Sequence, residues 1–539
     1  MTDGRIRRHR VVALVCAIGA ILMVGAPAAV AKGLNFKPCG EAGAQCAVAA
    51  VPYDYDHPGG AKLHIDVAKS PATGKRIGSL FFNFGGPGAP TAPYVEAYGP
   101  ALFPVLNERF DIIGMDPRGT GAPRSENSVW CNANAEQESI YSEPFPTPFN
   151  LDAGQLIRKD QRYQKKCFQN SNTKLLEHTA TADVARDMDF VRDALGEAKT
   201  TYLGFSYGTF LGATYASLFP KKMRAFVLDG PVNANSYINH PMQDLRAQTA
   251  AIERAQQRFF QACAAHQDAC EGFGGDDPHM AFDDLIEQAD AHPIQAAGYA
   301  PDPRPIKGDD IRAAAVAEMY NKYYWPGLAD ALARASHGDG SGIRQEVDED
   351  WYGRDPDTGE YDPLNDRYFL LTAAEQRYRK GDVGSYLQAG EDCWETYDHA
   401  YDNCGYVELN YGLWPAQAHD VFRGPFRVPK SANTPLVVDT TYDPATPYRG
   451  GLLLARDLGN ARVLTMKGDG HTAYGNGSPD CIDTAVENYL INQVLPPAGT
   501  KCKQNVPFEQ PSAALKQRSA KAHAVRRHNR PHMRSLVGR

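Results

Sequence analysis

The chain has 539 residues, of which 43% are hydrophobic and 22% charged, an ordinary composition for a globular protein with a sizeable core. Its 64 acidic and 56 basic residues give a formal net charge of −8 at pH 7, and both ends of the chain are basic. The body, residues 32–505, is therefore strongly acidic, which argues against a nucleic-acid partner because phosphate binding requires clustered Lys and Arg.

The first 31 residues have the pattern of a signal peptide. Four arginines lie between residues 5 and 10, residues 11–26 form a continuous apolar run, and Ala-Val-Ala at residues 29–31 supplies small residues for cleavage. An uncleaved membrane anchor is the alternative, but the apolar run is shorter than the ~20 residues of a typical span, and Pro27 interrupts it. We therefore expect a secreted, extracellular protein with no membrane span after cleavage.

Strand-like apolar runs alternate with helical stretches in the first half of the chain, as in a parallel sheet with crossover helices. The expected strands there cover residues 79–84, 110–115, 201–203 and 224–228, and the expected helices cover residues 182–195 and 209–218. The stretch 232–431 is mostly helical and polar, and the strand pattern returns at residues 435–439 and 462–466. We therefore predict a core made of residues 32–231 and 432–505, with residues 232–431 inserted as a helical cap over the carboxyl ends of the strands.

Residues 506–539 form a basic tail with few large apolar residues, a composition that predicts disorder. A solubilising tail is the favoured interpretation, and contact with an anionic cell wall is the alternative.

After Cys16, which leaves with the signal peptide, the chain keeps an even number of cysteines, as expected for disulfides in an exported protein. They are Cys39, Cys46, Cys131, Cys167, Cys263, Cys270, Cys393, Cys404, Cys481 and Cys502. Pairing of nearest neighbours is the simplest arrangement, although sequence alone does not fix the connectivity. No metal site is expected, because the cysteines show no CxxC motif and have no histidine cluster beside them.

Residues 204–208, Gly-Phe-Ser-Tyr-Gly, are the one G-x-S-x-G motif in the chain. A predicted strand precedes the motif and a predicted helix follows it. That context is typical of the sharp turn that lifts a serine hydroxyl off the edge of a sheet. The glycines suit a turn with no room for Cβ atoms. We therefore assign Ser206 as a candidate nucleophile, with an ordinary tight turn as the alternative.

A serine nucleophile also needs donors that hold the developing oxyanion. The Gly-Gly-Pro-Gly run at residues 85–88 follows an early predicted strand, and Pro87 has no N–H to donate. We assign the two donors to the backbone N–H groups of Gly86 and Tyr207. A Gly-Pro turn without a catalytic role is the alternative.

The base that takes the proton from Ser206 is assigned to His471. Of the 15 histidines it alone follows a late predicted strand, and it satisfies the chain order nucleophile, acid, histidine. Asp443, in the turn after residues 435–439, is our choice for the acid, and Asp229 and Asp439 are competitors. In this scheme Asp443 stays ionised, orients the imidazole and stabilises the imidazolium that forms as Ser206 loses its proton.

Together these motifs resemble the secreted tripeptidyl aminopeptidases of actinomycetes, relatives of proline iminopeptidase. The likeness covers about residues 36–502 and includes Asp-Pro-Arg-Gly-Thr-Gly at residues 116–121, Asp-Pro-Ala-Thr-Pro at 443–447 and Gly-His-Thr at 470–472. The resemblance implies an α/β-hydrolase fold with a mostly parallel sheet and an inserted helical cap. It also implies release of tripeptides from the free N-termini of peptides, without metal or cofactor. We expect a monomer.

Such an enzyme must bind the ammonium group of its substrate, and carboxylates in the cap are natural partners. Glu391, Asp392 and Glu395 are the candidates, and solvated surface acids are the alternative. Two other functions stay open. One is a secreted esterase or lipase on the same scaffold, because the catalytic chemistry is shared. The other is a non-catalytic binding protein that retained the fold, which the intact set of serine, acid and histidine argues against.

Overall fold

The structure is a computed structural model that describes residues 33–509 except residues 41, 143–144 and 402–403. The expected signal peptide, residues 1–31, and most of the expected tail lie outside the described residues. All described residues belong to one compact unit, Ala31–Arg539. Within them, every helix is too short or too polar to span a membrane.

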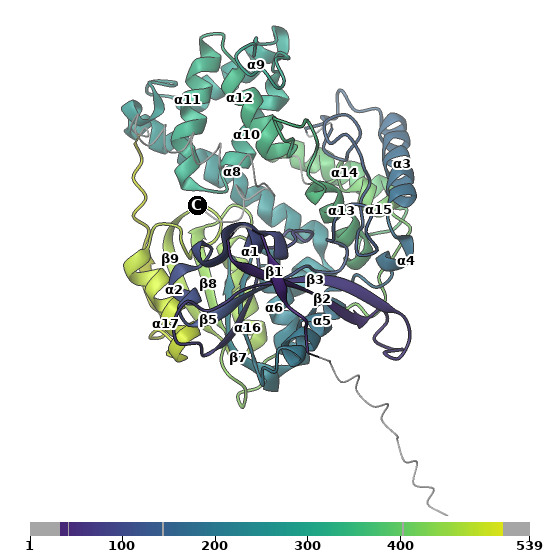
Figure 1. Ribbon diagram of the computed structural model, residues 1–539. Helices are drawn as coiled ribbons and strands as arrows, with labels where there is room; N and C mark the ends of the chain where they lie inside the picture. The colour runs from purple at the N-terminus through teal and green to yellow at the C-terminus, as the bar shows by residue number, and fades with distance from the viewer. Residues whose placement is uncertain (1–32, 41, 143–144, 402–403, 510–539) are drawn as a thin grey trace, which may run out of the picture. The chain divides into compact units, whose positions relative to one another are not determined.

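A ten-stranded sheet runs through the described part in the order β1-β2-β3-β5-β4-β6-β7-β8-β9-β10 (Figure 1). Its strands are β1 Lys37–Cys39, β2 Ala44–Pro52, β3 Lys62–Ser70, β4 Gly78–Asn83, β5 Phe110–Met115, β6 Thr200–Phe205, β7 Met223–Asp229, β8 Leu436–Tyr442, β9 Arg462–Asp469 and β10 Lys501–Lys503. In sheet order, all neighbouring pairs from β5 through β4 to β10 are parallel. Strands β1, β2 and β3 pair antiparallel with one another, and β3 pairs antiparallel with β5. The expected mostly parallel sheet is thus confirmed.

The central strands are buried on both faces, so their sequences read as continuous apolar runs. In β4, Phe81 packs into one core cluster while Leu80 and Phe82 pack into another. In β6, Tyr202 and Leu203 divide in the same way. Helices cover both faces: α1 Ala92–Tyr98, α2 Pro104–Asn107 and α17 Thr484–Asn492 on one, and α5 Thr181–Ala194, α6 Tyr207–Leu218 and α16 Tyr448–Leu458 on the other.

A helical block fills the chain between β7 and β8. Its helices are α7 Ala234–Asn239, α8 Pro241–Ala265, α9 Pro278–Ala291, α10 Gly308–Glu318, α11 Trp325–Ser336, α12 Ser341–Glu346, α13 Leu364–Glu375, α14 Val383–Trp394 and α15 Leu409–Leu413. Helices α8 to α12 share a core of their own, which includes Phe259, Leu285 and Leu332. In Figure 1, α8 to α12 lie above the sheet, and we call the whole block the cap.

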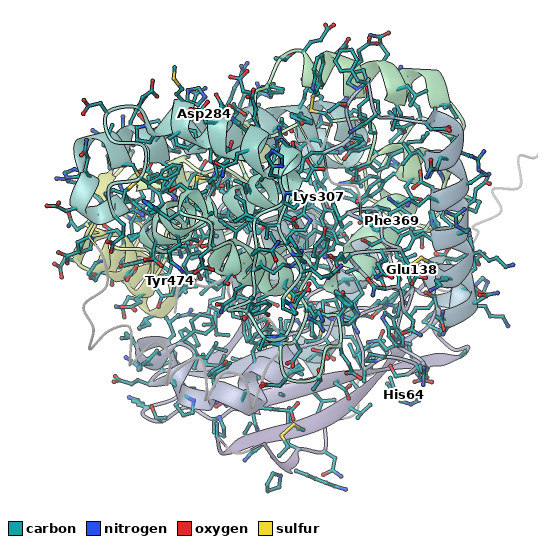
Figure 2. The ribbon with its side chains drawn as sticks, turned by 90° about the horizontal axis from the view of Figure 1, so that it is seen from above. His64, Glu138, Asp284, Lys307, Phe369 and Tyr474 are labelled. Carbon is teal, nitrogen blue, oxygen red and sulfur yellow. A yellow bond between two sulfur atoms is a disulfide. The ribbon has the colours of Figure 1, made fainter. Side chains whose placement is uncertain are left out.

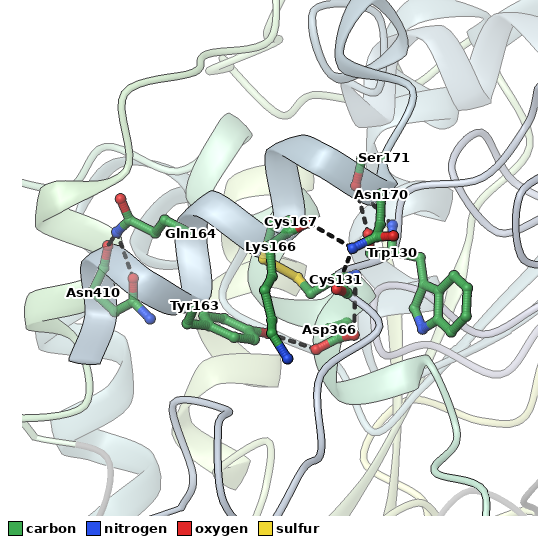
Figure 3. The surroundings of a disulfide bond; sticks show 10 residues. All are labelled: Trp130, Cys131, Tyr163, Gln164, Lys166, Cys167, Asn170, Ser171, Asp366 and Asn410. Carbon is green, nitrogen blue, oxygen red and sulfur yellow. Dashed lines mark hydrogen bonds between the residues drawn. A yellow bond between two sulfur atoms is a disulfide. The ribbon is translucent and has the colours of Figure 1, made fainter. Parts of the chain in front are cut away.

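The segment of residues 130–176, which the sequence analysis assigned to the core, shares the core cluster of α5 and α6 and also packs against the cap helices α13 and α15. It carries α3 Ala153–Asn170 and α4 Thr173–Leu176. Tyr163 of α3 donates its hydroxyl to Asp366 of α13 over 2.7 Å, and the same carboxylate accepts the N–H of Cys131 over 3.0 Å (Figure 3). The Cys131–Cys167 disulfide fastens the loop to α3 beside these contacts. The segment therefore connects the core to the cap.

The ten cysteines of the described part form five disulfides, each between neighbours in sequence. The pairs are Cys39–Cys46, Cys131–Cys167, Cys263–Cys270, Cys393–Cys404 and Cys481–Cys502. Two of them, Cys263–Cys270 and Cys393–Cys404, lie in the cap. Because such bonds persist in oxidising compartments, they fit an exported protein.

The Asp-Pro-Arg-Gly stretch after β5 has a structural role. Oδ1 of Asp116 accepts the N–H groups of Thr91 and Ala92, both over 2.8 Å, and so holds the start of α1. Arg118 is fully buried and pairs with Asp187 of α5 over 2.6 Å, while it also donates to a carbonyl at the end of β2 over 2.5 Å. These bonds connect the carboxyl end of β5 to three neighbouring elements, beside the loop that carries Gly86.

Candidate active site

Ser206 lies at the junction of β6 and α6 in a backbone conformation that a residue with a side chain rarely adopts. Its φ is +54° and its ψ is −126°, and its N–H donates to the carbonyl of Asp229 over 3.0 Å. The flanking glycines allow the turn to close: a Cβ at Gly204 would lie 2.5 Å from the carbonyl of Gly208, and one at Gly208 would lie 2.5 Å from the carbonyl of Asn83. Such local strain is concentrated at functional sites, where it fixes a side chain in place.

The glycine loop after β4 packs directly on this turn. Gly85 has a φ of +109°, and a Cβ there would lie 2.8 Å from the Cβ of Ser206 and 3.1 Å from the backbone nitrogen of Tyr207. Oδ1 of Asn83 accepts the N–H of Gly85 over 2.9 Å and braces the loop. Gly86 and Tyr207 line the same cavity as Ser206. The two residues expected to donate to an oxyanion are thus neighbours of the serine.

His471 and Asp443 are hydrogen-bonded at the ends of two adjacent parallel strands. Nδ1 of His471 lies 2.8 Å from Oδ2 and 3.0 Å from Oδ1 of Asp443. The carboxylate also accepts the N–H groups of Ala445 (2.8 Å), Thr446 (2.7 Å) and Thr472 (3.2 Å), and the hydroxyl of Thr446 over 3.0 Å. Because this carboxylate is surrounded by donors, it acts as an acceptor, and the proton on the imidazole lies on Nδ1.

The other ring nitrogen of His471 makes no hydrogen bond to Ser206 in this structure. Nε2 is buried and has no hydrogen-bond partner among the residues that the structure describes. The ring of Tyr320, from the cap, packs edge-on against the imidazole at 5.6 Å between centroids, and the N–H of His471 donates to the carbonyl of Tyr320 over 2.7 Å. The ring is therefore fixed on one side by Asp443 and on another by the cap.

The two acids that compete with Asp443, Asp229 and Asp439, have different surroundings. Asp229 accepts the N–H groups of Ala473 (2.9 Å) and Tyr474 (2.8 Å), just after His471, and burial raises its pKa to about 7. Burial and the neighbouring Asp443 and Asp229 raise the pKa of Asp439 well above its usual range. Among the three carboxyl groups, Asp443 is the one that bonds to the imidazole.

Asp469 connects the loop of His471 to the cap. Its carboxylate pairs with Arg258 of α8 and with Lys322, the latter over 2.9 Å. The guanidinium of Arg258 also lies 3.6 Å from the ring centre of Tyr442. Burial by itself would raise the pKa of Asp469, but the two cations outweigh burial and hold that pKa below its usual range.

The cavity at Ser206 is walled on its other side by the cap. Its cap lining includes Asp244, Gln248, Glu318, Tyr320, Asp350 and Tyr368. Carboxylate oxygens of Glu318, Glu346 and Asp350 lie within 4.8 Å of one another, and we call these three residues the cap acid cluster. Two of them, Glu318 and Asp350, face the cavity. Acidic side chains of the cap therefore line the same cavity as the serine.

The acids that the sequence analysis proposed for this role lie elsewhere, which is a correction. Glu391 and Glu395 are exposed on α14, and Asp392 pairs on the surface with Arg246 at 3.3 Å. None of the three lines the cavity at Ser206. The reason is the orientation of α14, which buries Tyr386 and Cys393 and turns its acidic face to solvent.

Sequence reasoning missed the cap acid cluster. The one signal in the sequence was Glu318, a single carboxylate at the end of the Ala- and Val-rich helix α10. In the structure Glu318 is only 5% exposed. Charged residues in such positions are rarely buried without a partner or a function. Glu346 and Asp350 gave no such signal, because they lie in a generally acidic stretch.

The mostly parallel sheet, with a serine at the sharp turn after β6 and a helical insertion before β8, defines an α/β-hydrolase. Comparisons with known proteins agree. Residues 80–271 match the family described as "alpha/beta hydrolase fold", and residues 412–502 match "TAP-like protein".

Three relatives align over most of the chain. Serine protease Hip1 of Mycobacterium tuberculosis is 31% identical over 90% of this chain and 95% of its own length. Carboxylesterase B of the same species is 32% identical over 85% of this chain and 86% of its own length. Tripeptidyl aminopeptidase of Streptomyces lividans is 28% identical over 83% of this chain and 81% of its own length. The chain therefore belongs to the α/β-hydrolase family of Hip1, a family of enzymes that includes serine peptidases.

The first prediction concerns Asp443. Asp443→Asn should lower kcat by about 10⁴-fold with little loss of stability, because an amide cannot fix the tautomer of His471 or stabilise an imidazolium. The matched control is Asp439→Asn, which replaces a buried acid in the preceding strand that makes no bond to the imidazole and should leave kcat within a few-fold of wild type. Steady-state hydrolysis of a chromogenic substrate measures both, and equal losses in the two variants would refute the role of Asp443.

The second prediction concerns acid stability. The folded pKa of Asp469 is depressed, so its ion pairs stabilise the fold above the unfolded carboxyl pKa of about 3.9 and are lost as pH falls through the lower folded value. Asp469→Asn should cost about 1–3 kcal/mol at pH 7 and should lessen the loss of stability between about pH 4 and pH 2. Urea unfolding across this range measures the effect. Asp284→Asn, at an exposed cap residue (Figure 2), is the control and should leave the profile unchanged.

Proposed function

We propose that the protein is a secreted serine aminopeptidase that releases short peptides, of three residues, from the free N-termini of peptide substrates. The observation that carries the proposal is the cavity itself. It has Ser206 on one wall, and Glu318 and Asp350 of the cap acid cluster on another. A substrate with a cationic end and a scissile carbonyl a short distance away suits such a cavity, because carboxylates form strong charge-assisted hydrogen bonds with an ammonium group.

The chemistry follows from the groups at the serine. In the proposal, Nε2 of His471 accepts the proton of the Ser206 hydroxyl as Oγ attacks the substrate carbonyl. The N–H groups of Gly86 and Tyr207 stabilise the oxyanion of the tetrahedral intermediate. The imidazolium, stabilised by Asp443, then protonates the leaving amine, and an acyl-enzyme remains. Water, deprotonated by the same imidazole, hydrolyses the acyl-enzyme and restores Ser206.

The length of the released peptide and the export of the protein rest on separate support. The tripeptide length comes from the sequence resemblance and from the relative named tripeptidyl aminopeptidase. Export is supported by the N-terminal sequence pattern and by the five disulfides. Mass spectrometry of the products from an unblocked peptide ladder would measure the number of residues removed.

An esterase is the second candidate, favoured by the relative named carboxylesterase B. A panel of tripeptide anilides and short acyl esters distinguishes the two. Turnover of esters without turnover of any free-amine peptide would support the esterase and contradict the peptidase.

The third prediction tests the cap acid cluster. Glu318→Gln should lower kcat/KM for a tripeptide p-nitroanilide with a free N-terminus by about 10- to 100-fold, because a charge-assisted bond of about 1.5–3 kcal/mol is lost. The same variant should change kcat/KM for the N-acetylated substrate only a few-fold. Glu395→Gln, at an exposed acid on α14, is the control and should affect neither substrate. Equal losses on both substrates in Glu318→Gln would contradict ammonium binding while leaving the serine chemistry intact.

A further inference from the structure

A second group of polar side chains lies in the cap, outside the cavity at Ser206. Helix α9 contributes His279 and Asp283, one turn apart on the same face. His399 comes from the loop that the Cys393–Cys404 disulfide closes, more than a hundred residues later, and is only 2% exposed. In the view from above, Asp284, the neighbour of Asp283, lies near the outer edge of the cap (Figure 2).

The geometry of this group matches the spacing of ligands around one metal ion. Nε2 of His399 lies 2.7 Å from Oδ1 of Asp283, and Nε2 of His279 lies 3.9 Å from Oδ2 of Asp283. One atom of each residue can be chosen so that all three lie within 4.8 Å of one another. Ligands about 2.0–2.2 Å from a tetrahedral zinc ion are themselves roughly 3.3 Å apart, so small movements of two partly exposed side chains would complete the arrangement.

Each imidazole presents Nε2 to the shared point. On His399, Nδ1 faces Oε1 of Glu253 at 3.3 Å, and Glu253 also accepts the N–H groups of His399 (3.2 Å) and Ala400 (3.1 Å). Glu253 therefore fixes the ring and leaves Nε2 for a ligand, which is the usual relation of carboxylate, histidine and metal.

His279 supplies an independent indication. Its ring stacks on Phe260 with an angle of 15° between the planes. Its Nε2 is shielded from solvent and has no hydrogen-bond partner within the described residues. A shielded ring nitrogen without a partner is costly, and a bound cation at the shared point would remove that cost.

We propose that the cap binds one zinc ion through His279, Asp283 and His399, with Glu253 positioning His399. Two imidazoles and one carboxylate are a donor set that zinc accepts, and the partial exposure of His279 and Asp283 leaves the fourth position to water. The ion connects α9 to the disulfide loop, and Glu253 extends the connection to α8. Ile252, beside Glu253, lines the cavity at Ser206, so the ion stabilises a wall of that cavity without touching the catalytic groups.

Without metal, the same residues form an ion-pair cluster. Burial by itself would lower the pKa of His399, but its bonds to Glu253 and Asp283 outweigh burial and raise that pKa.

The experiment uses the full exported protein, freed of metal by a chelator and titrated with zinc chloride in a calorimeter. One ion per chain should bind at this site and raise the Tm, because a ligand that binds only the folded state stabilises it. His279→Ala, at a partly exposed side chain, should weaken this binding by at least 10-fold, since loss of an outer partner alone costs about 10- to 100-fold. Glu253→Gln, which changes an outer partner, should weaken zinc binding by about 10- to 100-fold.

The matched control is His292→Ala, at the exposed C-cap of the same helix, which should bind zinc as the wild type does. The proposal is overturned if the wild type binds no zinc, or if His279→Ala binds it as tightly as His292→Ala does, which would place the ion at other histidines. An unchanged Tm in the presence of saturating zinc would likewise overturn it, and the cluster would then be an ion pair alone. None of these outcomes depends on the activity of Ser206.

Discussion

The contact between Asp443 and Nδ1 of His471 is the interaction on which the rest of the site depends. The two residues lie 28 positions apart in sequence, but β8 and β9 are parallel neighbours, so the turns that follow them emerge at the same edge of the sheet. Five donors converge on the Asp443 carboxylate, counting the imidazole itself. Because the proton of His471 is held at Nδ1, Nε2 is the nitrogen left for chemistry.

The cap is bonded to the loop that carries His471. The N–H of His471 donates to a cap carbonyl, that of Tyr320, and Asp469 is held by two cap cations. The loop that carries His471 is thus bonded to the cap on both sides of Gly470. The cap also supplies most of the cavity wall, including its acids. The lining of the cavity and the position of His471 therefore depend on the same helical insertion.

Much of this arrangement follows from local sequence. The strands of the parallel part are long apolar runs, and the serine turn, the glycine loop after β4 and the last two turns follow predicted strands. Because parallel strands end at one edge of a sheet, residues at their carboxyl ends can be grouped from the sequence alone. The same reasoning favours Asp443 over Asp439, which lies within its strand, but leaves Asp229 as a competitor; in the structure it is Asp443 that bonds to His471.

Other features could not be predicted, for physical reasons. In β2 the inward positions are largely alanines, such as Ala47 and Ala49, which have weak strand propensity, so the antiparallel edge shows no clear pattern. The packing of residues 130–176 on the cap depends on contacts such as Tyr163 with Asp366, which are about two hundred residues apart. The acids expected to bind an ammonium group lie beside a disulfide, whereas the cavity faces a different part of the cap.

The most direct test of the central claim is covalent labelling of the folded protein with a fluorophosphonate, followed by mass spectrometry of its peptides. The account predicts one adduct, on the peptide that contains Ser206, with labelling abolished in Ser206→Ala and slowed by orders of magnitude in His471→Ala. An adduct at another serine, or labelling of Ser206 at an unchanged rate in His471→Ala, would contradict it.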